Sequence, residues 1–225
     1  MEFQVKFSLN EKIFVKNPES SDTGREIVKR GIDLIYDMGF ENFTFKKLAQ
    51  TLNTSEATIY RYFENKHRLL LYITNWYWSF LQFLVEYKLQ NVTDPKVQLK
   101  IIIQLLTHDF PDTLSPLEYN KLYLNKIVIA ESSKVYLVKE VNEINKKQVF
   151  KPYKDLCAKL AGIISAYNPH YAYPLSLSST LIETSHHQQF FSLYLPKLTD
   201  VSPENKTHYT SNFLEDLLFG VLAQK

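Results

Sequence analysis

The chain has 225 residues, of which 45% are hydrophobic and 22% charged, and its formal net charge is +2. This length suits one large domain or a small domain attached to a larger one, and the composition excludes intrinsic disorder. The near balance of charges excludes a chain that is basic throughout, so a nucleic-acid surface would have to be a local patch.

With only five glycines and nine prolines, the chain has few positions for tight turns, which favours helices over a meander of strands. Residues 1–20 alternate apolar and polar side chains up to Asn17-Pro18, and this pattern predicts an extended arm. Apolar residues then recur at three- and four-residue steps, which predicts a helix from about residue 22 that Gly39 ends.

Two short helices and a long one are predicted next. Thr44 is placed to cap a helix over 45–52, and Asn53 tolerates the left-handed backbone of a turn. Ser55 can cap a second short helix that runs through Phe63. Asn65 can cap a longer helix that continues to about Leu89.

The rest of the chain repeats one helix-start motif, in which a capping residue precedes a proline at the first helical position. It occurs at Asp94-Pro95, Ser115-Pro116 and Ser202-Pro203, and Pro174 is expected to begin another helix. Pro152 interrupts the helical pattern of 134–166, so that element is expected to be kinked or split there. The sequence therefore predicts an all-α fold with about nine helices.

The two short helices have the dimensions of a helix-turn-helix, with about eight residues, a turn of about three, and a second short helix. Leu48, Leu52 and Ile59 can pack these helices together, and Ala49 is small enough to permit a close approach. This packing leaves four polar side chains of the second helix facing outward: Ser55, Glu56, Thr58 and Arg61.

Further positions around this motif follow one spacing: Gly39-Phe40, Thr44, Leu48-Ala49, Asn53-Thr54-Ser55, Thr58-Ile59-Tyr60, Tyr62-Phe63 and Lys66. With these residues, the stretch 24–70 resembles the tetracycline-repressor (TetR) family of transcriptional regulators. The resemblance implies an N-terminal arm and a helix-turn-helix DNA-binding domain over 1–66. It also implies a helical effector-binding and dimerisation domain over 67–225.

The resemblance implies which residues meet duplex DNA: Thr44, Ser55, Glu56, Ala57, Thr58, Tyr60, Arg61, Tyr62 and Lys66. Thr44, at a helix start, is expected to hold a phosphate, and residues 55–58 to read base edges. Tyr60, Tyr62 and Lys66 are the other expected phosphate contacts, whereas Phe63 is expected inside the domain. Between residues 44 and 68, five basic residues stand against two acidic ones, so positive charge is concentrated here.

Two positions depart from the family pattern. Asn53 stands where glycine is usual, and asparagine can adopt the same backbone conformation. Glu56 brings an acid close to DNA phosphates, which costs affinity unless the carboxylate accepts a hydrogen bond from a cytosine amino group. For Tyr60 and Tyr62, packing within a small three-helix core is the competing interpretation.

The resemblance further implies a small-molecule pocket among the middle helices, where aromatic side chains are abundant. Tryptophan and tyrosine suit such a pocket because they are apolar with a polar handle, although ordinary core packing explains each of them too. The candidates are Trp76, Phe80, Phe83, Phe110, Tyr123 and Tyr153.

Dimerisation is expected through the last two helices, which are predicted over 174–195 and 203–223. The candidates for that interface are Leu181, Phe190, Leu193, Leu214, Leu217, Leu218 and Val221. His186 and His187 point about 100° apart on a helix, which favours a packed helix face over a metal site.

The lone Cys157 excludes an intramolecular disulfide and favours a reducing compartment, and its amphipathic setting predicts a buried, inert thiol. The N-terminus carries Glu2 and Lys6 where a signal peptide would be apolar. No apolar run approaches the roughly 20 residues that span a bilayer. We therefore expect a soluble, cytoplasmic protein.

These features predict a DNA-binding transcriptional regulator, a ligand-responsive repressor that acts as a homodimer on a double-stranded operator. The partners are the operator, a second copy of the chain and an unknown small-molecule effector, with no cofactor, metal or membrane. The alternative, motivated by Glu56, is a helical ligand- or partner-binding protein of the same fold that no longer binds DNA. An enzyme is not expected, because the sequence has no phosphate loop, metal cluster or triad at a usable spacing. The operator, the effector, the sign of regulation and the role of the arm over 1–20 stay open.

Overall fold

The computed structural model describes residues 7–107, 119–136, 139, 141–146, 148–202 and 208–223. Within these ranges the regular structure consists of α-helices and short 3-10 helices, without a strand, which confirms the all-α prediction. The same ranges contain eleven α-helices, and none of them is long and apolar enough to cross a membrane.

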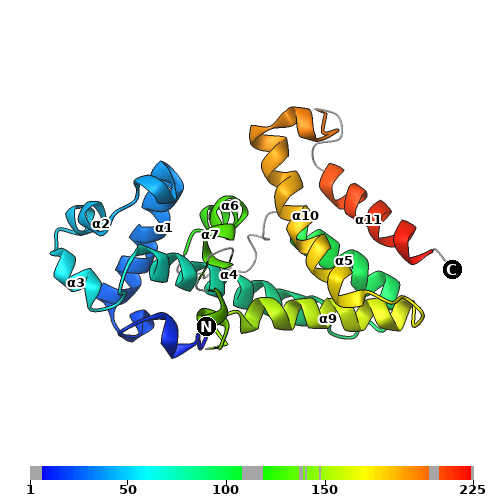
Figure 1. The fold of residues 1–225 in the computed structure, drawn as a ribbon, viewed down its shortest axis with the longest axis horizontal. Coiled ribbons are helices and arrows are strands. Elements are labelled where there is room, and N and C mark those ends of the chain that lie inside the picture. Colours follow the sequence, from blue (N-terminus) through cyan, green and yellow to red (C-terminus); the bar gives the residue numbers. More distant parts are fainter. Residues whose placement is uncertain are drawn as a thin grey trace. The chain divides into compact units, whose positions relative to one another are not determined.

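The chain divides into two compact units (Figure 1). Unit 1 comprises residues 1–80 together with 110–151, and unit 2 comprises residues 81–109 together with 152–225. Helix α4, Lys66–Lys88, contributes residues to both. Since unit 1 takes in helices well beyond residue 66, the boundary predicted at 66/67 describes function and stays a prediction.

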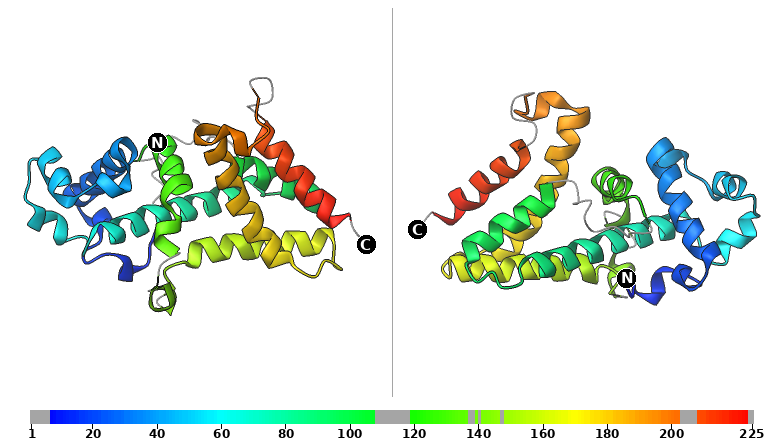
Figure 2. Two further views of the ribbon diagram at one scale, coloured as in Figure 1. Left: turned by 45° about the horizontal axis from the view of Figure 1, so that its top comes forward. Right: turned by 180° about the vertical axis from the view of Figure 1, so that it is seen from behind.

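Unit 1 begins with a segment that we call the strap, residues 7–21, which runs alongside α4 (dark blue in Figure 2). It contains two 3-10 turns, η1 over Glu11–Ile13 and η2 over Pro18–Ser20, within the arm that the sequence predicts to be extended. The turns form because the side-chain oxygens of Asn10 and Asn17 accept hydrogen bonds from backbone amides two residues on, each at 2.9 Å.

The helix-turn-helix follows the strap. Helix α1 spans Asp22–Asn42, α2 spans Phe45–Thr51 and α3 spans Glu56–Tyr60. The regular part of α1 ends at Gly39, whose φ of 76° only glycine adopts without strain, as predicted. Asn53 has a φ of 48° in the turn between α2 and α3, which confirms the left-handed conformation expected of it.

The predicted caps of these helices are confirmed. The hydroxyl of Thr44 accepts a hydrogen bond from the amide of Lys47 at 3.2 Å, and that of Ser55 accepts one from the amide of Thr58 at 3.3 Å. Asn65 caps α4 through the amide of Arg68 at 3.0 Å.

The prediction that the second short helix runs through Phe63 is wrong, because α3 ends at Tyr60. The amides of Tyr62 and Phe63 both donate to the carbonyl of Ile59, at 2.9 and 3.1 Å, so the chain tightens and turns inward. This turn carries the side chain of Phe63 into the core, where it is fully buried as predicted.

The remaining helices of unit 1 are α6 (Lys121–Glu131), α7 (Ser133–Tyr136) and α8 (Val141–Lys146). Helix α6 packs on α1, where the rings of Tyr36 and Tyr123 stack at 3.8 Å. The predicted helix start at Ser115-Pro116 lies outside the described residues.

Unit 2 contains α5 (Pro95–Thr107), α9 (Lys151–Tyr167), α10 (Pro174–Tyr194), η4 (Pro196–Leu198) and α11 (Tyr209–Leu222). The helix starts predicted at Pro95 and Pro174 are confirmed. Pro152 lies in the first turn of α9, where no amide is needed, so the helical pattern is split before it, as one of the two predicted outcomes. The start predicted at Ser202-Pro203 adjoins residues 203–207, which lie outside the described ranges, and α11 begins at Tyr209.

Polar contacts hold α10 against the end of α5. Ser185 and Gln189 both donate to the carbonyl of Leu106, at 3.1 and 3.0 Å, which satisfies a group that the last turn of α5 leaves without a helical partner. His186, beside them, is 3% exposed, whereas His187 is exposed and stacks on Phe191. The two histidines therefore face different surroundings.

Stability is expected to fall with acidification because of His186. Burial, with a smaller contribution from His187, lowers the pKa of His186 from 6.5 to about 4. Below pH 6.5, His186 is protonated in the unfolded chain but stays neutral in the folded chain. The contribution of the neutral His186 to the free energy of unfolding is therefore complete above pH 6.5 and is lost as the pH falls toward 4. The full loss is about 2–4 kcal/mol.

Urea unfolding at pH 7 and pH 5 measures this effect. The wild type should lose more stability between the two values than a His186→Leu variant, while exposed His170→Gln should behave like the wild type. Equal losses for all three proteins would contradict the burial argument.

Candidate nucleic-acid interface

The helix-turn-helix is assembled by a small apolar core. Leu48 and Ala49 of α2 and Ile59 of α3 are buried, at 0%, 3% and 0% exposure. The turn is closed by a hydrogen bond of 2.9 Å from the amide of Thr54 to the carbonyl of Ala49. These contacts fix α3 on α2 and determine which of its side chains face outward.

The outward surface of α3 carries most of the residues predicted to meet DNA. Ser55, Glu56, Ala57 and Arg61 are exposed, and Tyr60 is 49% exposed while its ring edge rests on Phe45. Glu56 forms no ion pair within the described residues, so its carboxylate is available to a ligand. The surface has the position and the polar groups that base reading requires, and the contacts themselves stay a prediction.

The hydroxyls of Thr58 and Thr44 both take part in hydrogen bonds of the helix-turn-helix. The Thr58 hydroxyl lies 3.1 Å from both the Thr54 and the Ser55 hydroxyls, so its polar group is occupied and its methyl group is left for apolar contact. The Thr44 hydroxyl accepts the capping hydrogen bond and keeps its own hydrogen as a donor, and the residue is exposed at the start of α2. Its predicted phosphate contact can therefore use both the hydroxyl and the α2 amides.

The Tyr62 hydroxyl faces the end of the strap, and the phosphate contact expected of it stays a prediction. Tyr62 is 4% exposed, and its hydroxyl lies 2.8 Å from the hydroxyl of Ser21, the residue that caps α1. This hydrogen bond, with the charges of Lys16 and Arg61, lowers the pKa of the Tyr62 phenol against the opposing effect of burial. Core packing, the competing interpretation from the sequence, therefore describes Tyr62.

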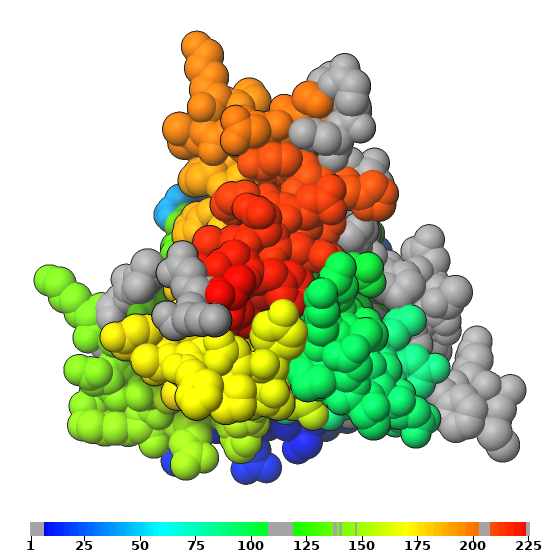
Figure 3. Space-filling model, turned by 90° about the vertical axis from the view of Figure 1, so that its right-hand side faces the viewer, coloured from blue at the N-terminus to red at the C-terminus, as the bar shows by residue number. Residues whose placement is uncertain are grey.

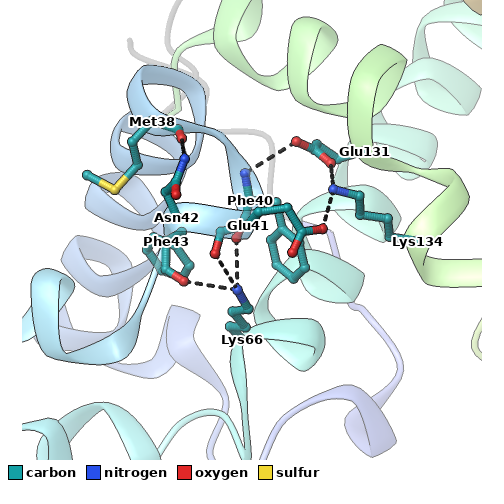
Figure 4. Close-up of polar contacts among 8 residues, drawn as sticks. All are labelled: Met38, Phe40, Glu41, Asn42, Phe43, Lys66, Glu131 and Lys134. Atoms are coloured by element: carbon teal, nitrogen blue, oxygen red, sulfur yellow. Dashed lines mark hydrogen bonds and ion pairs between the residues drawn. The ribbon is translucent and has the colours of Figure 1, made fainter.

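Lys66 also has a structural role that the sequence did not indicate. Its ammonium donates to three carbonyls at the end of α1, those of Phe40, Glu41 and Phe43, at 3.0, 3.1 and 3.2 Å (Figure 4). An ammonium has three N–H groups, so all of them are used within the chain. In this arrangement Lys66 closes the end of α1 and has no hydrogen left for a phosphate.

A second set of charges holds the same turn from the side of α6 and α7. Glu131 accepts a hydrogen bond from the amide of Phe40 at 3.2 Å, and Lys134 lies 2.7 Å from the carboxylates of both Glu41 and Glu131 (Figure 4). The hydrogen bond from Lys134 lowers the pKa of Glu41. Burial acts to lower the pKa of Lys134, but the two carboxylates outweigh it and raise that pKa. Phe40 and Glu131 are about 90 positions apart in the sequence, so no local sequence pattern could predict their contact.

Three of the five basic residues counted between 44 and 68 have partners within the chain, although a hydrogen bond to a neutral carbonyl leaves the positive charge in place. Lys66 is bound to carbonyls, Lys47 donates to the carbonyl of Asn42 at 2.8 Å, and Arg68 pairs with Glu64 at 3.3 Å. Of the five basic residues between 44 and 68, Lys46 and Arg61 alone have no ion pair or hydrogen bond for their charged groups within the described residues.

The predicted pocket residues occupy several environments. Trp76 and Phe80 are buried in unit 1, where their rings stack at 5.5 Å and Phe7 of the strap packs edge-on against both. Tyr119 packs edge-on against Trp76 at 5.2 Å. This cluster is filled by the chain itself, so for Trp76 and Phe80 the core interpretation holds in this conformation.

The other pocket candidates are spread over both units. Tyr123 is stacked on Tyr36 in unit 1, whereas Phe83 and Tyr153 belong to unit 2. Tyr153 donates a part-buried hydrogen bond of 2.8 Å to Glu183 of α10. Phe110 lies outside the described residues, and the pocket as a whole stays a prediction.

Some residues of the predicted dimer interface are buried within the single chain, and others are exposed. Leu181, Leu214 and Leu218 are 0% exposed within a single chain, so they contribute to the core of unit 2, and their contact with a second copy stays a prediction. Phe190, Leu217 and Val221 are half-buried and Leu193 is 47% exposed. These four stay candidates on the surfaces of α10 and α11, which Figure 3 shows in orange and red.

Three solved structures have the same fold. AibR in complex with isovaleryl coenzyme A and operator DNA is 16% identical, with 87% of this chain and 98% of that chain covered and a TM-score of 0.59. A TetR-family transcriptional regulator from Agrobacterium tumefaciens is 15% identical, with 92% and 100% covered and a TM-score of 0.55. The superantigen PfiT is 12% identical, with 93% and 100% covered and a TM-score of 0.57. At these identities the likeness shows a shared fold. No curated protein sequence matches the chain.

Residues 27–73 match the model of a protein family described as "Bacterial regulatory proteins, tetR family". The match covers most of α1, all of α2 and α3, and the start of α4, which is the helix-turn-helix whose geometry is given above. The fold and this motif define a helix-turn-helix regulator of transcription. Over these residues the helix-turn-helix matches the tetR family of bacterial regulatory proteins, the resemblance that the sequence predicted.

Proposed function

We propose that this regulator binds double-stranded operator DNA as a homodimer and acts as a ligand-responsive repressor. Each subunit would place α3 in the major groove, with the two half-sites about one helical turn apart or somewhat more. A small molecule that favours the arrangement without DNA would release the dimer through its differential affinity. Such a regulator would act in the cytoplasm and would carry out no reaction of its own.

One observation carries this proposal. Ser55, Glu56 and Ala57 stand exposed at the start of a helix whose base is locked on α2 by buried Ile59 and capped by Ser55 itself. A rigid, capped helix with small and polar side chains at its N-terminal end can enter the major groove and reach base edges. Glu56 would then accept a hydrogen bond from a cytosine amino group.

The exposed residues of α10 and α11 support the homodimer. Phe190, Leu193, Leu217 and Val221 retain exposed apolar area after the subunit has folded, as a self-complementary interface requires. The functional division into a DNA-binding part over 1–66 and an effector and dimerisation part over 67–225 follows from this assignment. AibR was crystallised with both an acyl coenzyme A and operator DNA, which supports a small-molecule effector for the same fold.

The test is DNA binding by the full chain, measured by fluorescence anisotropy. The probes are a duplex from upstream of its own coding sequence and a random-sequence duplex of equal length. The upstream duplex should bind about 1,000-fold more tightly or better, and both affinities should weaken steeply between about 50 and 200 mM salt. A folded dimer that binds neither duplex at the lower salt would overturn the proposal.

A partner-binding protein without DNA affinity is the second candidate. The observation in its favour is the engagement of Lys47, Lys66 and Arg68 within the chain, which leaves few free cations beside exposed Glu56. PfiT, a superantigen with this fold, shows that the architecture also serves proteins described by other functions. Absence of DNA binding by the intact dimer would favour this candidate.

A further inference from the structure

The strap is fastened to the helix-turn-helix at the end of α3. The amide of Val15 donates to the carbonyl of Tyr62 at 2.8 Å, and the hydroxyl of Ser21 lies 2.8 Å from that of Tyr62. Two hydrogen bonds to one residue, one from its backbone and one from its side chain, fix both the position and the direction of the strap.

The strap is also anchored on its other side. Glu19 accepts hydrogen bonds from the hydroxyls of Tyr72, at 2.8 Å, and Tyr119, at 2.7 Å. Phe14 packs edge-on against Tyr72, and Ile13 is 1% exposed. The described part of the arm is therefore built into unit 1.

Lys16 lies between these two sets of contacts. Its side chain is exposed, and its ammonium lies 5.2 Å from the centre of the Tyr62 ring. Within the described residues no carboxylate forms an ion pair with it. The ammonium also forms a side-chain hydrogen bond with Tyr62, which helps to lower the pKa of that phenol. Arg61, the neighbour of Tyr62 in the sequence, is exposed, and its guanidinium has no ion pair or hydrogen bond within the described residues.

We propose that the strap presents Lys16 to the phosphate backbone of duplex DNA, where it forms one cationic contact site with Arg61 at the end of α3. This inference rests on the proposed DNA-binding function. It adds a cation beside Tyr62 and Lys66, whose polar groups form hydrogen bonds inside the chain. Tyr62 becomes the support on which the Lys16 side chain rests.

In this contact the charged group is the Lys16 ammonium, and its position is restricted before DNA binds. A lysine on a flexible arm loses much side-chain entropy when it binds a phosphate, and a backbone fixed by Val15 and a side chain resting on an aromatic ring reduce that loss. A phosphate contact positions the protein on DNA and carries no base preference. Lys16 is therefore expected to strengthen binding to every duplex alike.

The experiment compares Lys16→Gln with the wild type on a random-sequence duplex and on the duplex from upstream of the coding sequence. Both affinities should weaken several-fold and by the same factor. The slope of log K against log salt should decrease by about 0.9 for each subunit on the DNA. Lys16→Arg should restore both values, since a guanidinium also binds phosphate. Thermal unfolding of each variant checks that the fold is intact.

Lys12→Gln is the matched control, because Lys12 is an exposed lysine of the same strap. It should leave the salt slope unchanged. An unchanged slope for Lys16→Gln, or an equal decrease for Lys12→Gln, would overturn the inference while leaving DNA binding by the wild type in place. Failure of the wild type to bind either duplex would instead remove the proposed function on which the inference rests.

Discussion

Lys66→Met is expected to lower the free energy of unfolding by about 2–3 kcal/mol, as the loss of hydrogen bonds from a charged donor predicts. The ammonium of Lys66 is the donor for three carbonyls at the end of α1, and methionine keeps most of the side-chain volume without any donor. The carbonyls of Phe40 and Phe43, which belong to buried residues, would lose this partner. Urea unfolding followed by circular dichroism measures the change.

Two companion variants distinguish this structural role from a phosphate contact. Lys46→Met removes an exposed charge of the same domain and should leave stability nearly unchanged. Lys66→Arg keeps the positive charge but replaces the compact ammonium by a planar fork, which cannot converge on three carbonyls in the same way. It should therefore be destabilised too. A stable Lys66→Met protein with a reduced salt slope of DNA binding would return Lys66 to the phosphate backbone.

Gly24→Ala is the second substitution with a large expected effect. A methyl group at Gly24 would lie 2.2 Å from the carbonyl oxygen of Pro18 and 2.6 Å from its Cα, so the backbone of the strap would have to move. Overpacking of this kind costs about 2–3 kcal/mol. The displaced strap would also lose its hydrogen bonds to Tyr62, and hydrogen exchange at the amide of Val15 would report that loss.

Gly162→Ala is the matched control within the same chain. Gly162 lies in the middle of α9, and an added methyl group there meets no atom within 4 Å. The variant should be more stable by about 0.5–1 kcal/mol, because alanine favours the helix. Opposite signs for the two glycines are the expected result. An unchanged free energy of unfolding for Gly24→Ala would contradict the overpacking argument, because it would mean that the strap can move without destabilising the fold.

The parts of the fold that depend on local chemistry could be predicted from the sequence. Thr44, Ser55 and Asn65 cap helices because their side chains reach an amide within three residues, and such reach is visible in the spacing alone. Gly39 and Asn53 are likewise local, since a left-handed backbone restricts which residues fit. The helix-turn-helix is a short-range structure, and that is why its residues identified it.

The roles of single side chains depended on partners distant in the sequence. Tyr62 meets Ser21, which is 41 residues away, and Lys66 meets carbonyls 23 to 26 residues away. The resemblance assigned these side chains to DNA because it described a surface, whereas the chain folds the strap and α1 against them. Leu181 was a candidate for the dimer interface, but the sequence of a helix does not show which of its apolar residues the subunit buries in its own core.

The charged contacts from α6 and α7 to the end of α1 bear on how this protein can be recombined with its relatives. Glu131 and Lys134 hold Phe40 and Glu41 from a part of the chain that an exchange at residue 66 would replace. A hybrid that joined residues 1–66 of this chain to the C-terminal part of a relative would leave the Phe40 amide and the Glu41 carboxylate without their partners. Transferable recognition therefore requires that the donor's Glu131 and Lys134 travel with the first 66 residues, although they lie far outside them.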